Sequence, residues 1–391
     1  MLSLVVAVCS TVTVEPRPAL AEVVAGACPL SSGGTAQPNE GATNYSLYLR
    51  PKGTIPAIMI FVDFSDAPRS ETTGSLYDLI APNAMAWYQE VSKERMALSI
   101  TPKHKWYRMP SPSTAYGFDD ALTFQEQRTY IANAVARSNP DLDFSPYKII
   151  YVVSSDGAAI PVSPAFIGYP GDGVTVDGVE IRHGATFGND IRLPRQDYGS
   201  HVLIHETGHI FGLPDLYEYG LPYWDLLRKV GGWDTMSWVA PGAYFLAWHQ
   251  KKFGWLPPRQ MLCVTSGQIT QTIAPLEAHG GLKMIEIKTG PSAAYVIEVR
   301  QRIGQDAGLC DTGVLIYSVK ASVANGLGPV RVQPAMAGND QAMIESCGPR
   351  YNATFDLGAG EISTFSDSSR GVTVELLSTA SGSYSVSITK A

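Results

Sequence analysis

The sequence predicts an α+β domain followed by an all-β domain with a sandwich-like arrangement of strands. Two continuous apolar runs rich in β-branched and aromatic residues, 57–64 and 148–153, predict buried strands. The segments 75–92 and 121–138 have helical spacing, so strands and helices alternate in this part of the chain. Short alternating runs separated by Gly, Pro and Asn dominate after residue 258, where we place a domain boundary.

Four runs of alternating residues are the clearest strands expected in the second domain, 259–391. They cover residues 284–288, 294–299, 313–319 and 384–388. The chain has 391 residues and exceeds a typical single domain. We therefore expect each of the two domains to bury a core of its own.

Composition excludes some partners without naming a function. The formal net charge is -7, and no run rich in Lys or Arg offers phosphate groups an electrostatic footprint. We therefore expect no nucleic-acid partner. The apolar fraction of 45% together with 37 Gly and 27 Pro indicates a loop-rich globular protein rather than a disordered one.

The N-terminal residues resemble an export signal. An apolar run from Leu2 to Val14 leads to a small-x-small site at Ala19-Leu20-Ala21, which predicts a signal peptide over 1–21 and a secreted, extracellular protein. No later stretch reaches the roughly 18 consecutive apolar residues that a membrane helix requires. Residues 22–45 are rich in Gly, Ser, Ala, Asn and Pro, so we expect a linker or a short pro-segment there.

The segment His205-Glu206-Thr207-Gly208-His209 carries the strongest chemical signal. On a helix, predicted here over 199–212, residues i and i+4 share one face, so the imidazoles of His205 and His209 can converge on one zinc ion. Glu206 lies at the edge of that face, where its carboxylate can reach a water on the metal rather than the metal itself. This is the position of a general base.

A third metal ligand is expected just after the helix. Gly212 can adopt φ > 0 and end the helix, and Pro214 prevents the helix from resuming. Asp215 is then the expected third ligand, which gives the pattern HExxHxxGxxD and leaves one coordination position for water. Three other side chains remain alternative ligands: Glu218, Asp225 and His201.

A second motif lies downstream, where residues 231–237 read GGWDTMS. The pairing of HExxHxxGxxD with a downstream G-x-WD-x-M resembles the M6 family, the immune inhibitor A-like zinc metallopeptidases. The resemblance implies a zincin-like catalytic domain over 46–258, zinc as cofactor, and Met236 as the Met-turn methionine beneath the metal. Looser similarity covers roughly residues 50 to 320.

The residues and the resemblance together imply a secreted zinc-dependent endopeptidase that acts on protein or peptide substrates. A zinc ion held by His205, His209 and Asp215 would lower the pKa of a bound water, and Glu206 would take its proton. A tyrosine could donate a hydrogen bond to the oxyanion, with Tyr217, Tyr219 and Tyr244 as candidates. Two alternatives stay open: an inactive zincin-fold binding protein, and a zinc amidase or esterase acting on a non-protein substrate.

Cysteines and acidic residues supply two further expectations. After signal cleavage four cysteines remain, so we expect two disulfides, and the sequence allows all three pairings of Cys28, Cys263, Cys310 and Cys347. An alternative is that the Cys28 thiolate caps the zinc and keeps the enzyme latent. Structural calcium is a further expectation, with oxygen ligands drawn from Asp63, Asp66 or Asp234. The sequence leaves the oligomeric state open.

Overall fold

The first half of the chain forms a mixed sheet with helices on both faces. The computed structural model describes residues 22–32, 38–118, 121–336, 343–344 and 346–391. The five strands follow the order β3-β2-β4-β8-β5. β3, β2, β4 and β8 are parallel, and β5 at the edge is antiparallel to β8. Their bounds are β2 Gly53–Asp63, β3 Met96–Arg108, β4 Ile149–Ser154, β5 Ala165–Ile167 and β8 His183–Phe187.

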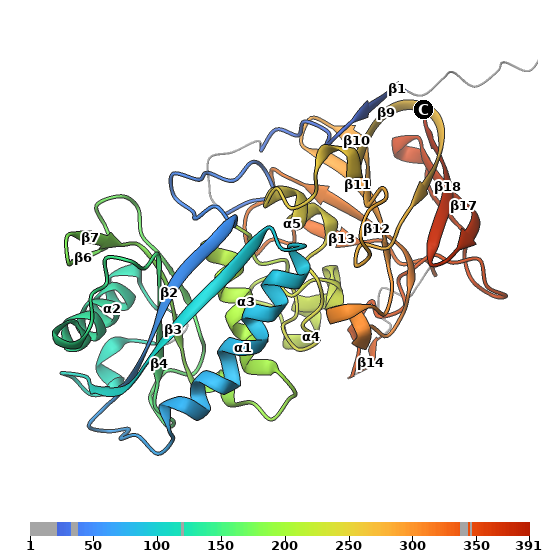
Figure 1. The fold of residues 1–391 in the computed structure, drawn as a ribbon. Coiled ribbons are helices and arrows are strands. Elements are labelled where there is room, and N and C mark those ends of the chain that lie inside the picture. Colours follow the sequence, from blue (N-terminus) through green and yellow to red (C-terminus); the bar gives the residue numbers. More distant parts are fainter. Residues whose placement is uncertain (1–21, 33–37, 119–120, 337–342, 345) are drawn as a thin grey trace, which may run out of the picture.

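Alternation along β2 explains why both faces of this sheet are covered. Ala57, Met59 and Phe61 belong to the core beneath helices α1 (Thr73–Val91) and α3 (Tyr198–Ile210). Ile58, Ile60 and Val62 point to the opposite face and pack under α2 (Phe124–Ser138). Successive side chains of a strand face opposite sides, so a continuous apolar run is what a doubly covered strand requires. Figure 1 shows β2 and β3 between α2 and α1.

The predicted elements of this half are confirmed, but β3 was not predicted. The expected strands 57–64 and 148–153 correspond to β2 and β4, and the expected helices 75–92, 121–138 and 199–212 correspond to α1, α2 and α3. β3 carries Pro102 and the polar run 103–105, which weaken a strand signal. It tolerates both because it is an edge strand, where a missing backbone donor costs little.

The remaining elements are short or belong to the second half. They are β1 Glu22–Ala25, η1 Ser113–Tyr116, η2 Asn139–Asp141, β6 Val174–Val176, β7 Val179–Ile181, η3 Asn189–Arg192, α4 Tyr223–Leu226, η4 Leu227–Lys229, η5 Gly231–Trp233, α5 Ala247–Lys252, η6 Pro258–Gln260, β9 Met261–Ile273, β10 Met284–Gly290, β11 Ala293–Arg300, η7 Gly304–Gly308, β12 Gly313–Lys320, β13 Val330–Val332, β14 Met343–Ile344, β15 Gly348–Pro349, β16 Thr364–Asp367, η9 Ser368–Arg370, β17 Val372–Ala380 and β18 Ser383–Lys390.

The second half is one curled sheet rather than two separate sheets. Its strand path is β13-β12-β11-β10-β9-β18-β17-β16, and β1 adds to β9. Residues 261–264 of β9 pair with β10, and residues 267–273 pair with β18. Gly267, with φ of 82°, lies where the pairing partner changes. All four predicted strand runs are confirmed, as β10, β11, β12 and β18, whereas alternation alone could not show that β9 joins both parts.

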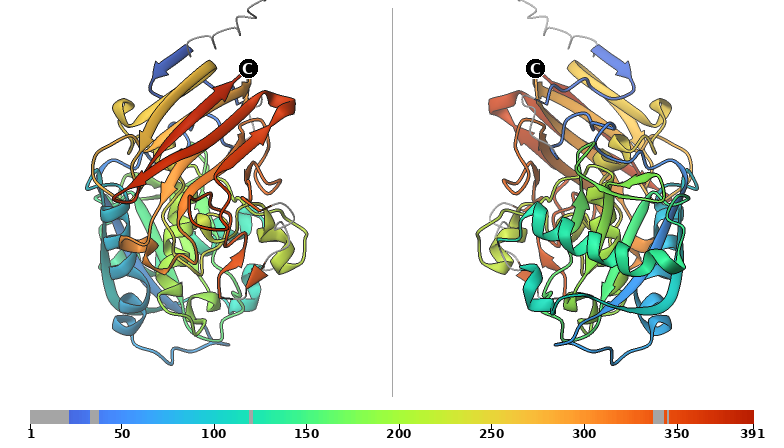
Figure 2. Two further views of the ribbon diagram at one scale, coloured as in Figure 1. Left: turned by 90° about the vertical axis from the view of Figure 1, so that its right-hand side faces the viewer. Right: turned by 90° about the vertical axis from the view of Figure 1, so that its left-hand side faces the viewer.

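The two halves of the chain share a hydrophobic core. One face of the curled sheet encloses an apolar cluster that includes Val264, Ile297 and Val386. The opposite face, with Val296 and Leu315 among its residues, contributes to the same cluster as helices α1 and α3. Each half thus buries a cluster of its own, as expected, but the coverage of β11 and β12 on both faces adds a core that the two halves share. Figure 2 shows this sheet from two sides, with β17 and β18 remote from α2 in Figure 1.

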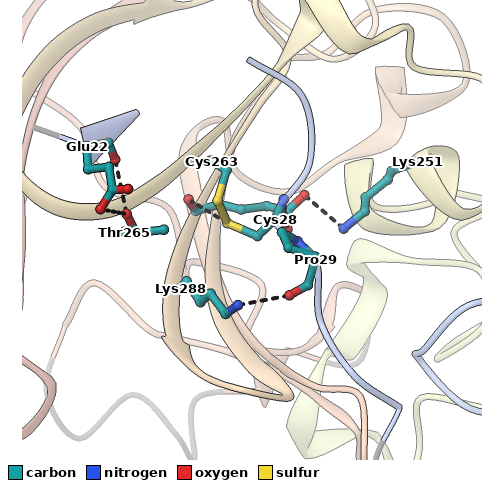
Figure 3. The surroundings of a disulfide bond; sticks show 8 residues. Glu22, Cys28, Pro29, Lys251, Cys263, Thr265 and Lys288 are labelled. Carbon is teal, nitrogen blue, oxygen red and sulfur yellow. Dashed lines mark hydrogen bonds and ion pairs between the residues drawn. A yellow bond between two sulfur atoms is a disulfide. The ribbon is translucent and has the colours of Figure 1, made fainter. Parts of the chain in front are cut away.

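The segment that we expected as a linker or short pro-segment is attached to the body at several points. β1 pairs with β9, and Cys28 forms a disulfide with Cys263. Figure 3 shows this bond with Lys288 donating to the Pro29 carbonyl at 3.0 Å. Further along, Asn39 makes a β-bridge with Ala324. Because the Cys28 sulfur is bonded to Cys263, the alternative that its thiolate caps the zinc is wrong.

Both expected disulfides are present, and the second joins Cys310 to Cys347. Disulfides persist in oxidising compartments, so they fit an extracellular location. Within the described ranges no helix has the length and apolar character needed to cross a bilayer. The predicted signal peptide, 1–21, lies outside the described residues.

A buried charge cluster joins the two halves. The guanidinium of Arg300 is fully buried, with Nη2 2.6 Å from the Asp306 carboxylate and Nη1 3.2 Å from Glu298. Nη1 also donates to the Trp233 carbonyl at 2.8 Å, in the second motif. Nε lies 3.4 Å from Glu277, and burial, followed by the nearby Asp306 carboxylate, raises the pKa of Glu277 to about 9. The guanidinium is therefore the shared cation of this acidic cluster.

Replacing Arg300 by Met should lower the free energy of unfolding by about 3–5 kcal/mol, because the carboxylates of Glu298 and Asp306 would stay buried without their cation. Urea titration followed by circular dichroism measures the change. Arg370→Met is the control, since Arg370 is half-exposed and lies 3.4 Å from Asp367; it should change stability by less than about 0.5 kcal/mol. Equal effects of the two changes would contradict the prediction.

Candidate metal centre

Helix α3 delivers the first two candidate ligands to the floor of a cleft. Two glycines let the helix approach α1 on one side and Met236 on the other. A Cβ on Gly199 would lie 2.8 Å from Ile80 of α1, and a Cβ on Gly208 would lie 2.6 Å from the sulfur of Met236. The fully buried Met236 therefore packs directly under the turn that separates His205 from His209.

Two backbone carbonyls fix the orientation of both imidazoles. His205 Nδ1 lies 2.9 Å from the Thr235 carbonyl, and His209 Nδ1 lies 2.9 Å from the Leu213 carbonyl. A carbonyl oxygen only accepts hydrogen bonds, so each Nδ1 carries the proton. In a neutral ring each Nε2 therefore carries a lone pair that can bind a metal ion. A metal-ligating histidine usually donates its other nitrogen in this way.

Asp215 completes a triangle of ligand atoms. Its Oδ1 lies 3.1 Å from His205 Nε2 and 3.3 Å from His209 Nε2, and the two Nε2 atoms are 3.1 Å apart. Tetrahedral zinc with ligand bonds of about 2.0–2.1 Å separates its ligands by roughly 3.3 Å. Asp215 Oδ1 is buried and accepts no hydrogen bond, as expected of an atom that faces a cation. Among the described residues, these three are the one group of His, Cys, Asp and Glu side chains arranged to hold a metal ion.

The electrostatics of the site favour bound positive charge. Burial disfavours a charged His209, but Asp215 and Glu206 outweigh burial and raise the pKa of His209 to about 9. Burial likewise opposes the charge of Asp215, yet the two imidazoles hold its pKa well below the usual range. A divalent cation supplies the same compensation as these protons. The three residues therefore fit zinc in both geometry and charge.

The turn after α3 brings Asp215 back to the helix, as the sequence predicted. Gly212 has φ of 94°, and a Cβ there would lie 2.6 Å from Thr43, so both backbone conformation and space require glycine. Two side chains then hold Asp215 in place, one through its carboxylate and one through its backbone. The Tyr219 hydroxyl donates to Asp215 Oδ2. Asn325, from the second half of the chain, accepts from the Asp215 N–H at 2.7 Å and donates to Tyr219 at 2.8 Å.

The alternative third ligands lie elsewhere. Glu218 is 3.6 Å from Lys229, and Asp225 pairs with Arg228 at 2.6 Å. His201 lies next to Gly242 and lines a different cavity with Asn83 and Asp197. None of the three belongs to the metal-binding group.

A cleft of about 640 Å³ opens over the candidate metal centre. Glu206 is 8% exposed and lines the cleft beside the ligands. Burial raises the pKa of its carboxyl group to about 7, so near neutrality this group can both accept and return a proton. The cleft walls are mainly apolar and aromatic, and they include Val162, Ala165, Ile167, Tyr198, Val202, Tyr217, Tyr223, Leu226, Leu227, Trp238 and Val239.

The three candidate oxyanion donors have different surroundings. Tyr244 is buried, and its hydroxyl donates to Glu90 at 2.6 Å, remote from the cleft. The Tyr219 hydroxyl already donates its hydrogen bond to the Asp215 carboxylate. Tyr217 lines the cleft, and its ring stacks on His205 with centroids 6.3 Å apart. Burial and the Asp215 charge hold the pKa of Tyr217 well above its usual range, so its hydroxyl keeps its proton.

The carboxylates considered for calcium have other partners. Asp63 pairs with Arg108 at 2.8 Å, and Asp66 accepts from the N–H and the hydroxyl of Ser113. Asp234 accepts from two backbone N–H groups. Among the described residues, none of these three side chains belongs to the group that could hold a metal ion.

Several residues of the site escaped sequence reasoning. Asn325 and Pro38 reach the cleft from segments far from the motif, and Tyr198, Tyr223 and Trp238 line it. The Asn325 position reads as an ordinary turn in the sequence, with no signal that links it to Asp215. Only long-range folding brings these groups together.

No protein-family model matches the chain, and no curated protein matches it.

Replacing Asp215 by Ala should weaken zinc binding more than about 100-fold, because one of three ligands is lost and this exceeds the 10–100-fold effect typical of residues that only orient ligands. Competition with a chromophoric chelator measures the affinity. Asp225→Ala is the matched control and should keep the parent affinity. Stoichiometric, tight zinc in the Asp215 variant would move the third ligand elsewhere.

Tyr219→Phe should weaken zinc binding by about 10-fold, since it removes the hydroxyl that orients Asp215 but keeps the ring. The same chelator competition gives the number. Tyr223→Phe is the control because Tyr223 also lines the cleft but bonds to Trp238 rather than to a ligand. An unchanged affinity in Tyr219→Phe would show that the Tyr219 hydroxyl does not position the carboxylate.

Proposed function

We propose that this chain is a secreted zinc-dependent endopeptidase of the immune inhibitor A-like type. The observation that carries the proposal is the triangle of ligand atoms from His205, His209 and Asp215, with the carboxyl group of Glu206 beside it in an open cleft. Zinc bound there would polarise a substrate carbonyl and activate a water. Three protein ligands leave a coordination position for that chemistry.

Glu206 is the proposed general base. Its carboxyl group has a pKa of about 7 because it is buried, and a group with a pKa near the operating pH is the most effective proton carrier. It would accept a proton from the attacking water and return it to the leaving amine. Tyr217 is the proposed hydrogen-bond donor to the oxyanion, since it lines the same cleft and keeps its proton.

The sheet edge beside the cleft favours a peptide as substrate. The five-stranded sheet ends at β5, and Ala165 and Ile167 of this strand line the cleft. An extended peptide can pair with a free strand edge through its backbone, while the apolar walls accept its side chains. A small ester or amide would use none of these features.

Glu206→Ala should abolish cleavage of unfolded casein while the zinc content of the protein stays at one equivalent, because the change removes the base but no ligand. Gel analysis and metal analysis on the same samples provide both readings. Small acyl substrates serve as the control for a non-peptidase activity. Zinc-loaded parent protein that leaves casein intact but hydrolyses small acyl substrates would contradict the endopeptidase proposal and favour the amidase or esterase.

A further inference from the structure

Glu40 is a buried carboxylate in the segment that precedes the first sheet. It is 1% exposed, although its neighbourhood in the sequence is rich in Gly, Asn and Pro. Its Oε1 lies 2.9 Å from His249 Nε2, and its Oε2 accepts from Trp248 Nε1 at 2.9 Å and lies 3.3 Å from Lys252 Nζ. All three partners belong to helix α5. A burial this complete needs such compensation.

His249 continues the chain of contacts to the second motif. Its other ring nitrogen, Nδ1, lies 2.8 Å from Asp234 Oδ2, and both side chains are fully buried. Asp234 in turn accepts from the Met236 N–H and from the Leu246 N–H, each at 2.7 Å. The imidazole thus connects two carboxylates from segments almost two hundred positions apart in the chain.

The stretch that Asp234 fixes is the one that orients a metal ligand. The carbonyl of Thr235 accepts from His205 Nδ1 at 2.9 Å. The Thr235 hydroxyl donates to the Ala243 carbonyl at 2.6 Å, and the Met236 sulfur lies beneath Gly208. A shift of residues 234–236 would therefore move both the acceptor of His205 and the support under helix α3.

Charges strengthen this connection. Burial alone would raise the pKa of Glu40, but Lys252 and His249 outweigh it and lower the pKa to about 2. Burial alone would lower the pKa of His249, but Asp234 and Glu40 outweigh it and raise the pKa to about 9. At neutral pH a charged imidazole therefore forms an ion pair with a buried carboxylate on each side.

We propose that Glu40 is a positioning residue for the metal centre, which acts through His249 and Asp234 to hold the Thr235 carbonyl against His205. Residues 39–41 then belong to the working enzyme rather than to a removable pro-segment. The inference rests on the proposed zinc site. The inference goes beyond that site by assigning a role to Glu40, which lies outside every recognised motif.

The same segment contains a carboxylate contact that serves as a comparison. Glu286 is also fully buried, accepts from the Cys28 N–H at 3.2 Å, and pairs with Lys251 at 2.8 Å. It holds the N-terminal segment and α5 as Glu40 does, but its described contacts do not include residues 234–236. Figure 3 shows Lys251 reaching towards this region beside the disulfide.

The experiment compares Glu40→Gln with Glu286→Gln in the full chain. Zinc affinity comes from chelator competition, and the absorption spectrum of the Co²⁺-substituted protein reports ligand geometry. Glu40→Gln should weaken zinc binding about 10–100-fold and change the Co²⁺ spectrum, as loss of a ligand-orienting group does. Glu286→Gln should keep the parent affinity and spectrum, even where its melting temperature falls equally.

A second variant keeps the test decisive. His249→Gln breaks the same connection from its centre and should reproduce the loss of affinity and the altered spectrum. Three outcomes would overturn the positioning role. The first is parent-like zinc affinity in folded Glu40→Gln, and the second is an equal loss of affinity in Glu286→Gln. The third is failure of both Glu40→Gln and His249→Gln to fold. Failure of the proposed function itself is visible separately, because the parent would then bind no stoichiometric zinc or would leave casein intact.

Discussion

The position of the Asp234 carboxylate determines much of the geometry of the candidate metal centre. It is fully buried and joins three parts of the chain: the backbone of Met236, the backbone of Leu246 and the imidazole of His249. The residue that follows it, Thr235, supplies the acceptor for His205. A buried carboxylate is costly unless all its bonds form together, so it favours one arrangement of these segments over near alternatives.

The curled sheet is part of this support and not an appended module. Arg300 of β11 donates to the Trp233 carbonyl, Glu298 accepts from the Ala247 N–H at 2.7 Å, and Asn325 binds the backbone of Asp215. One face of β11 and β12 contributes to the core of helices α1 and α3. A chain cut at residue 258 would therefore lose the partners of the second motif and one orienting contact of Asp215, the candidate third ligand.

The sequence predicted what depends on local spacing. A doubly buried strand such as β2 reads as a continuous apolar run, and the i, i+4 spacing of His205 and His209 defines one helix face. Gly212 predicted the turn that brings Asp215 back to helix α3. The features that the sequence could not predict depend on long-range contacts. They are the switch of β9 between two sets of partners, the shared core across residue 258, and the burial of Glu40 in a polar stretch. Composition describes a segment's average tendency, and a single buried charge is invisible to it.

The contacts of the N-terminal segment have a physical rationale beyond attachment. Chain entropy favours release of a Gly- and Ser-rich stretch, so it must be tied down at more than one place to stay ordered. The Cys28–Cys263 disulfide does this covalently and Glu40 does it by charge. The disulfide alone would leave the residues between Cys28 and β2 free to move. Because Glu40 meets His249 next to Asp234, the point where the segment is held by charge is also the point where the second motif is held in place. The order of a segment that looks dispensable and the geometry of the candidate metal centre thus depend on the same imidazole.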